Sequence, residues 1–219
     1  MNEVAVNSGI QSGGTNDGVA YGVRMTREKN QLTAFGVPAL FELTRQGRVF
    51  TGNIAAAGVI LPIYSNTAQQ VGLWNPVGSG VDLLVLRLSP TYVDTSGAAG
   101  GYVIGQLTNA PAAVGTGLAI TAFTETAAIP AYNGAGYAAK AKFGQGATLT
   151  VTTPTIKQHL GLNQNAFTAA GTGQMPYRAD YQFDGDLVVT PGTAIFVAGL
   201  IATLAKFSGS LAWAEIDRV

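Results

Sequence analysis

The sequence contains no cysteine, and this absence excludes several kinds of site at once. Disulfide bonds, thiolate metal sites and catalysis by a cysteine nucleophile all require that residue. Histidine, the most frequent general base in enzymes, occurs once, as His159. The fold must therefore be stabilised by packing and hydrogen bonds, and few residues are available for catalysis.

Charged residues are also scarce. They make up 11% of the chain, against roughly 25% in ordinary soluble domains. The 12 basic and 12 acidic residues cancel, so the chain lacks the positive surface that nucleic-acid binding requires. A surface with few charges has little charge to desolvate on association, which favours permanent contact with other proteins. We therefore expect protein partners and no nucleic acid.

Long apolar runs are missing as well. The longest, Ala194–Ala205, has 12 residues, whereas a membrane-spanning helix needs about 20. Met1–Val4 does not begin a basic segment followed by an apolar one, so no signal peptide is indicated. We expect a buried element at 194–205 and no membrane partner.

Residues 1–36 have the composition of an extended N-terminal arm. Residues 1–20 hold four Gly, three Asn and two Ser with little apolar periodicity, so they cannot bury enough surface to fold alone. Residues 21–36 carry a basic cluster, Arg24, Arg27 and Lys29, with one acidic residue inside it. Apolar side chains in such a segment need a surface to cover them, and we predict that Val23, Leu32 and Phe35 contact a partner.

Residues 37–219 are expected to form an all-β domain, a jelly-roll-like β-sandwich. Short apolar runs alternate with turn residues, as in Val81–Leu88 after the Asn75–Gly80 turn cluster. Leu40–Leu43 and Arg48–Thr51 flank a predicted hairpin turn. Residues 91–145, rich in Gly and Ala, are predicted to include an insertion.

Two further segments carry clear local signals. Ile156–Asn163 is the best candidate for a short helix, although Gly161 weakens it. Near the C-terminus, Pro191-Gly192 predicts a turn between two strands, and the final strand is predicted at Leu211–Ile216. The alternation of that strand places Leu211, Trp213 and Glu215 on one face.

The sequence offers little support for catalysis or cofactor binding. No G-x-S-x-G elbow accompanies His159, and no phosphate-binding G-x-x-x-x-G-K-[ST] loop occurs. We expect the protein not to be an enzyme and to bind no cofactor, and we name no catalytic residue.

Metal binding has one weak candidate, the carboxylates of Asp180, Asp184 and Asp186 in the sequence DYQFDGD. Oxygen-rich clusters suit calcium, but the distal Glu of the calcium-loop pattern is missing. Asp184-Gly185 is also a favoured turn pair, which accounts for that carboxylate without a metal.

Carbohydrate binding by exposed aromatic rings is an alternative. The chain has aromatic residues that could stack on sugars: Tyr21, Trp74, Tyr92, Tyr102, Tyr132, Tyr137 and Trp213. In a sandwich of this size, Trp74 and Trp213 are better explained as core residues.

Two stretches resemble virion structural proteins of tailed phages. Gly47–Ser89 contains a Gly/Ala stretch and the sequence LWNPVGSG followed by an aliphatic strand. Leu187–Asp217 resembles the closing strands of a viral single jelly roll, in which a Pro-Gly turn feeds two final strands and the last carries W-x-E.

The resemblance implies a jelly roll of about eight strands that assembles as a homotrimer and decorates or cements a phage capsid. Its partners would be copies of itself and the major capsid protein or other virion proteins. The protein would then reside in the virion, after assembly in the host cytoplasm. The alternative is a carbohydrate- or receptor-binding β-sandwich module, viral or cellular.

Overall fold

The computed structural model describes residues 39–93, 100–108, 120–134, 137–149, 154–164, 180–201 and 206–218. The chain divides into a unit of residues 1–42 and a unit of residues 43–219, and all described strands belong to the second. The predicted N-terminal arm, with Val23, Leu32 and Phe35, lies outside the described residues. No helix in the described part of the chain combines the length and apolar character needed to cross a membrane.

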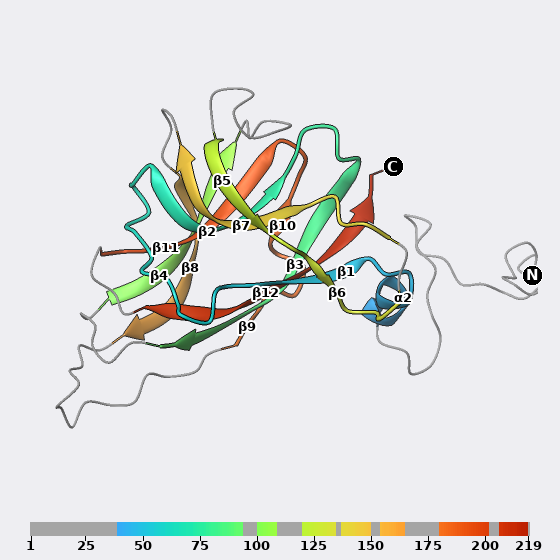
Figure 1. Ribbon diagram of the computed structural model, residues 1–219, viewed down its shortest axis with the longest axis horizontal. Coiled ribbons are helices and arrows are strands. Elements are labelled where there is room, and N and C mark those ends of the chain that lie inside the picture. The colour runs from blue at the N-terminus through green and yellow to red at the C-terminus, as the bar shows by residue number, and fades with distance from the viewer. Residues whose placement is uncertain are drawn as a thin grey trace, which may run out of the picture. The chain divides into compact units, whose positions relative to one another are not determined.

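The described strands form two antiparallel sheets that pack face to face, which confirms the predicted all-β sandwich (Figure 1). The first sheet consists, in spatial order, of β10 (Val188–Val189), β3 (Val81–Tyr92), β12 (Phe207–Asp217), β1 (Val49–Asn53) and β6 (Ile129–Pro130), and β9 (Tyr181–Gln182) also pairs with β3. The second sheet consists of β5 (Ile120–Thr126), β7 (Lys142–Leu149), β2 (Ala68–Asn75), β11 (Thr193–Gly199), β4 (Gly100–Thr108) and β8 (Thr155–Gln164).

Eight of these strands have the connectivity of a jelly roll. β1 pairs with β12, β2 with β11, β3 with β10 and β4 with β8, so the pairs are nested like a long hairpin that has been rolled up. Successive strands therefore alternate between the two sheets except at the β4–β8 step. This arrangement brings the two ends of the domain sequence together in the first sheet.

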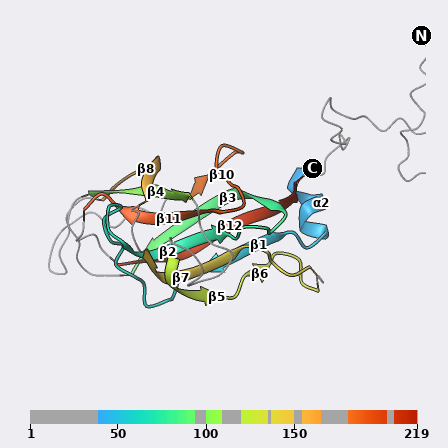
Figure 2. The ribbon, with the colours of Figure 1, turned by 90° about the horizontal axis from the view of Figure 1, so that it is seen from above.

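Three strands lie outside the nested pairs. β5, β6 and β7 all fall between β4 and β8 in the sequence, within residues 120–149. β7 extends the second sheet beside β2, and β6 extends the first sheet beside β1. Figure 2 shows the three strands gathered at the same side of the sandwich. We call this part of the chain, residues 120–149, the added segment.

The core lies between the sheets, and β3 follows the expected alternation only over its first half. On β3, Leu83 and Val85 are buried, but the inward position then shifts to Leu88. A β-bulge causes the shift, because Ala212 pairs with Arg87 and Trp213 with Val85, which leaves Leu86 without a partner on β12. Simple alternation along this strand therefore fails after residue 85.

The turn between β2 and β3 is fixed by a buried side chain. Asn75 donates hydrogen bonds from Nδ2 to the carbonyls of Val81 and Val189, both at 2.8 Å. It also accepts a hydrogen bond from Ser79 Oγ at 2.6 Å. The predicted turn cluster is confirmed. The hydrogen bond from Asn75 to Val189 links this turn to β10, which lies in the C-terminal part of the chain.

The second sheet also carries an apolar cluster distinct from the main core. Its buried members are Trp74, Leu107, Ile120, Ala147, Leu149, Ala194 and Phe196, with Phe123 packed against them. The Phe123 and Trp74 rings meet edge to face at 5.9 Å. A Cβ atom at Gly72 would overlap the Phe196 ring, so the glycine makes room for this cluster.

Two predicted elements are wrong. The segment read as one side of a hairpin, Leu40–Leu43, belongs to the helix α2 (Ala39–Arg45). Gly47 ends this helix with a φ of +75°, and the N–H groups of Gly47 and Arg48 bond to Thr44 O and Leu43 O, both at 2.9 Å. This is a Schellman motif, so the glycine marks a helix end and not a β-turn.

The second error concerns Ile156–Asn163, which was predicted as a helix and forms part of strand β8. Val103 pairs with His159 and Ile104 with Gln158, so the strand is held by its ladder with β4. Its exposure alternates from residue 155 to residue 160 with the period of a strand. Pairing with β4 has overridden the local preference of this segment for a helix.

Candidate functional site

Glu215 is a carboxylate with no solvent exposure on the inner face of β12. Its Oε1 accepts the N–H of Ala141 at 2.8 Å and the N–H of Lys140 at 2.9 Å, and its Oε2 lies 3.0 Å from the same Lys140 nitrogen. A carboxylate can remain in an apolar core only with such charge-assisted bonds. Glu215 therefore fixes the start of β7 to the first sheet.

Three further side chains complete what we call the Glu215 cluster: Tyr137, Arg48 and Asp217. The Arg48 guanidinium carbon lies 4.8 Å from the centre of the Tyr137 ring, and its Nη1 is 2.7 Å from Asp217 Oδ1. The backbone contributes a further hydrogen bond, in which Glu215 N donates to Arg48 O at 2.9 Å. The residue before β1, the end of β12 and the added segment thus meet at one polar cluster.

The cluster shifts the pKa values of Tyr137, Asp217 and Arg48. Burial raises the pKa of Tyr137 to about 12, assisted by the negative charge of Glu215 and a hydrogen bond to it. The hydrogen bond from Arg48 lowers the pKa of Asp217, and the same bond raises the pKa of Arg48. The phenol is held in its neutral form, and the pair Arg48–Asp217 is held in its charged form.

A row of aromatic rings continues from the cluster into the core. The centres of Tyr137 and Phe50 are 6.0 Å apart, those of Phe50 and Trp213 are 5.9 Å apart, and those of Trp213 and Phe143 are 6.1 Å apart. Phe143 belongs to the second sheet and reaches Gly52 of the first, where a Cβ atom would overlap its ring. The rings, two of which belong to the added segment, therefore couple the two sheets.

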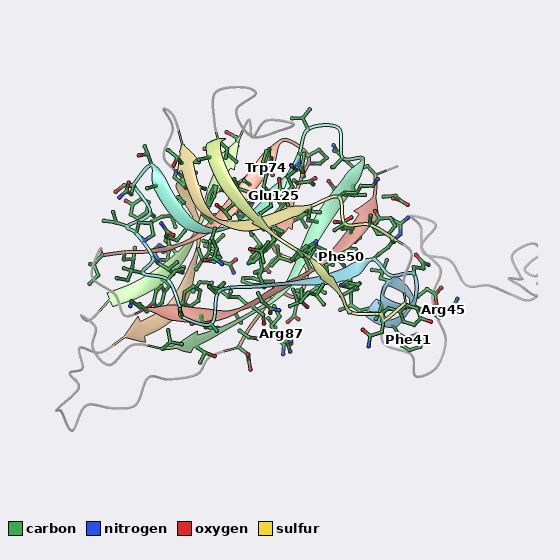
Figure 3. The ribbon with its side chains drawn as sticks, viewed as in Figure 1. Phe41, Arg45, Phe50, Trp74, Arg87 and Glu125 are labelled. Atoms are coloured by element: carbon green, nitrogen blue, oxygen red, sulfur yellow. The ribbon has the colours of Figure 1, made fainter. Side chains whose placement is uncertain are left out.

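A pocket of about 390 Å³ lies beside this row. Its lining is mainly aromatic rings and small apolar side chains: Phe50, Tyr137, Phe143, Pro130, Ala127, Ala128, Ala138, Ala139 and Ala141, together with Glu125, Thr126 and Lys142. Figure 3 labels Phe50 among the side chains between the sheets and Glu125 on β5. Apart from Phe50 of β1, every lining residue comes from the added segment, so this segment creates the pocket.

The charges of the pocket are already paired. Lys142 Nζ lies 2.6 Å from Glu125 Oε1, and the same nitrogen lies 5.3 Å from the centre of the Trp74 ring. Glu215, below the pocket wall, is bonded to two backbone amides. This arrangement can hold a group of fitting shape, whereas neither carboxylate is placed as a free proton acceptor.

The predicted site residues lie elsewhere. Asp180, Asp184 and Asp186 are exposed, and no group of three or more metal-ligating side chains occurs within the described ranges. Gly185 has a φ of +101°, in agreement with a turn at Asp184-Gly185. His159 is exposed on β8. Val23, Leu32 and Phe35 fall outside the described residues.

Of the five aromatic side chains considered for sugar stacking that the structure describes, three are buried. Trp74 and Trp213 have no exposed surface and Tyr102 has 2%, which confirms the interpretation as core residues. Tyr137 packs against Phe50 and under Arg48. Tyr132 is exposed, while Tyr21 and the side chain of Tyr92 lie outside the described part.

Sequence reasoning did not find the Glu215 cluster as a site. One signal was present, because the alternation of the last strand placed Glu215 on the same face as Leu211 and Trp213. A carboxylate on an apolar face requires a partner, and the amides of Lys140 and Ala141 are that partner.

Comparison with known protein families, with curated proteins and with solved structures finds no match to this chain. The assignment of a function therefore depends on the fold, the site and the composition.

Proposed function

We propose that the protein is a structural component of a tailed-phage virion: a capsid decoration, or cement, protein that assembles as a homotrimer on the phage head. Its partners would be copies of itself and the major capsid protein or other virion proteins. The role requires no catalytic residue, cofactor, nucleic acid or membrane.

The observation that carries the proposal is the way the two phage-like segments pair. Gly47–Ser89 spans β1, β2 and most of β3, and Leu187–Asp217 spans β10, β11 and β12. These strands form three of the four nested pairs. Two stretches that resemble virion proteins in sequence are therefore partners in space, within a jelly roll, an architecture that viral capsid domains use.

The composition supports an assembly role. With 11% charged residues, contact surfaces can be covered without desolvating many ions. A decoration protein binds a shell at many equivalent places, so weak contacts add up through multivalency. In this proposal residues 1–36 lie across neighbouring subunits, with Val23, Leu32 and Phe35 as contacts.

The test is co-sedimentation of the full-length protein with emptied capsids of the phage whose genome carries the gene. We expect saturable binding with a fixed ratio to the major capsid protein. A protein that stays in the supernatant contradicts the proposal. Saturable binding on a glycan array, without capsid binding, would support a carbohydrate-binding module in its place.

A further inference from the structure

An exposed turn in the added segment contains Asn133-Gly134, the only Asn-Gly pair in the sequence. The turn follows β6 and precedes Tyr137 of the Glu215 cluster. Gly134 has a φ of +103°, a backbone conformation that glycine adopts without steric cost. A Cβ atom at Gly134 would meet no atom within 4 Å, so this side of the turn is open to solvent.

The pair carries the two groups that react when an asparagine deamidates. The backbone nitrogen of Gly134 loses its proton to hydroxide, attacks the side-chain carbon Cγ of Asn133 and expels the amide nitrogen as ammonia. The product is a five-membered succinimide ring, which water opens at either of its carbonyl carbons. One opening gives aspartate and the other gives isoaspartate, in which the main chain runs through the former side chain. In total, one water is taken up and one ammonia is released.

The local structure favours closure of this ring. The side chain of the residue after an asparagine crowds the attacking nitrogen, least for glycine, which has no Cβ, and most for β-branched residues. The nitrogen must also be free of a strong hydrogen bond, and the asparagine side chain must be free to rotate. Within the described ranges, Gly134 N donates no hydrogen bond and the side chain of Asn133 makes none.

Three other asparagines with described side chains each lack one of these conditions. Asn53 is exposed, but it is followed by the β-branched Ile54, whose N–H is already donated to a carbonyl of β12 at 2.8 Å. Asn66 is exposed, but threonine follows it and its Oδ1 accepts a backbone N–H at 3.0 Å. Asn75 is buried, and the proline after it has no N–H to lose.

The exposed pair Asp184-Gly185 is a comparison for the glycine nitrogen. An aspartate before glycine can form the same ring by losing water, and Gly185 also has a positive φ, of +101°. The N–H of Gly185, however, donates to the carbonyl of Phe183. Its nitrogen is therefore less available for attack than that of Gly134.

We propose that Asn133 is a site of spontaneous deamidation in the folded protein and becomes a mixture of aspartate and isoaspartate. The reaction adds a negative charge to the turn. The chain is held on both sides of the turn, because Ala131 N donates to Val49 O at 2.8 Å and the Tyr137 ring lies 6.0 Å from that of Phe50. The extra main-chain atom of isoaspartate is therefore taken up at the exposed tip. This inference does not depend on the proposed function.

The test is incubation of the full-length protein at mildly alkaline pH. Peptide mapping by mass spectrometry follows the loss of the amide, and methylation by a protein isoaspartate methyltransferase labels isoaspartate. We expect isoaspartate to form at Asn133 at least about tenfold faster than at Asn53, Asn66 or Asp184, a factor equal to about 1.4 kcal/mol in the barrier.

The variant Asn133→Gln is the matched control. It keeps an amide at the same exposed position, but its longer side chain cannot form the five-membered ring, so the methylation signal at residue 133 should disappear. A parallel incubation in guanidinium chloride separates sequence from fold. An Asn133 that stays intact in the folded protein overturns the proposal, and its reaction in the denaturant alone would show that the fold protects the turn. Equal rates at Asn133 and Asn53 in the folded protein would overturn it as well.

Discussion

The carboxylate of Glu215 and the backbone N–H of Ala141 lie 2.8 Å apart, although 74 residues separate them in the sequence. This bond joins the last strand of the jelly roll to the start of β7 in the added segment. Beside it, the Arg48–Asp217 pair and Tyr137 join β1 to the same place. The wall of the pocket is therefore held by a buried charge, and the shape of the pocket depends on that charge.

Replacing the Glu215 carboxylate should destabilise the fold. Glu215→Gln keeps the size of the side chain but removes the charge and brings an amide donor toward two backbone donors. We expect a loss of about 2 kcal/mol in the free energy of unfolding, measured by urea denaturation. Asp217→Asn is the control on the same strand: its side chain is 66% exposed, so its loss should stay below about 1 kcal/mol. Equal losses for the two variants would contradict the role given to Glu215.

Close contact between the sheets at Gly52 should make this position intolerant of a methyl group. Gly52→Ala would push a Cβ atom into the Phe143 ring, and we expect a cost of about 1–3 kcal/mol. Shortening the ring partner should relieve the overlap. The double variant Gly52→Ala/Phe143→Leu is therefore expected to lose less stability than the sum of the single variants, by more than about 0.5 kcal/mol. Strict additivity in denaturation experiments would show that the two residues do not interact.

Tyr137 should make stability depend on pH in the alkaline range. Its pKa rises from 10.0 to about 12 on folding, so the folded state favours the neutral phenol. This contribution is complete below the pKa of the unfolded chain and is lost as the pH rises through the pKa of the folded one. The free energy of unfolding should therefore fall more steeply between about pH 10 and 12 in the natural protein than in Tyr137→Phe. Parallel curves for the two proteins would refute the assignment.

The assembly should be insensitive to salt. Screening weakens contacts between exposed charges, but a chain with only 11% charged residues is expected to associate mainly through apolar and uncharged polar contacts. We expect the oligomer to keep its mass from low to high ionic strength in sedimentation experiments. Dissociation at high salt would show that ion pairs dominate the interface and would contradict this view of the composition.

Much of the fold could be predicted where the sequence pattern is local. Pro191-Gly192 predicts the turn that the structure contains: Thr193 N bonds to Thr190 O at 3.1 Å and Gly192 has a φ of +80°. The last strand and the common face of Leu211, Trp213 and Glu215 were also predicted, and the structure shows that all three side chains are buried. These features need only turn chemistry and the two-residue period of a strand.

Features that depend on distant partners could not be predicted. β8 is a strand because of its ladder with β4, although Ile156–Asn163 has the local pattern of a helix. The bulge at Leu86 is visible only from the pairing of β3 with β12. The pocket requires β1 to meet residues 125–143, and no spacing in the sequence indicates that contact.

The native mass of the full-length protein tests the central claim of self-assembly most directly. Light scattering on the purified chain, over a range of concentrations, should give a stable species of three times the chain mass of 22.5 kDa. A single species at 22.5 kDa at every concentration would contradict the account and redirect the search to a monomeric carbohydrate- or receptor-binding module.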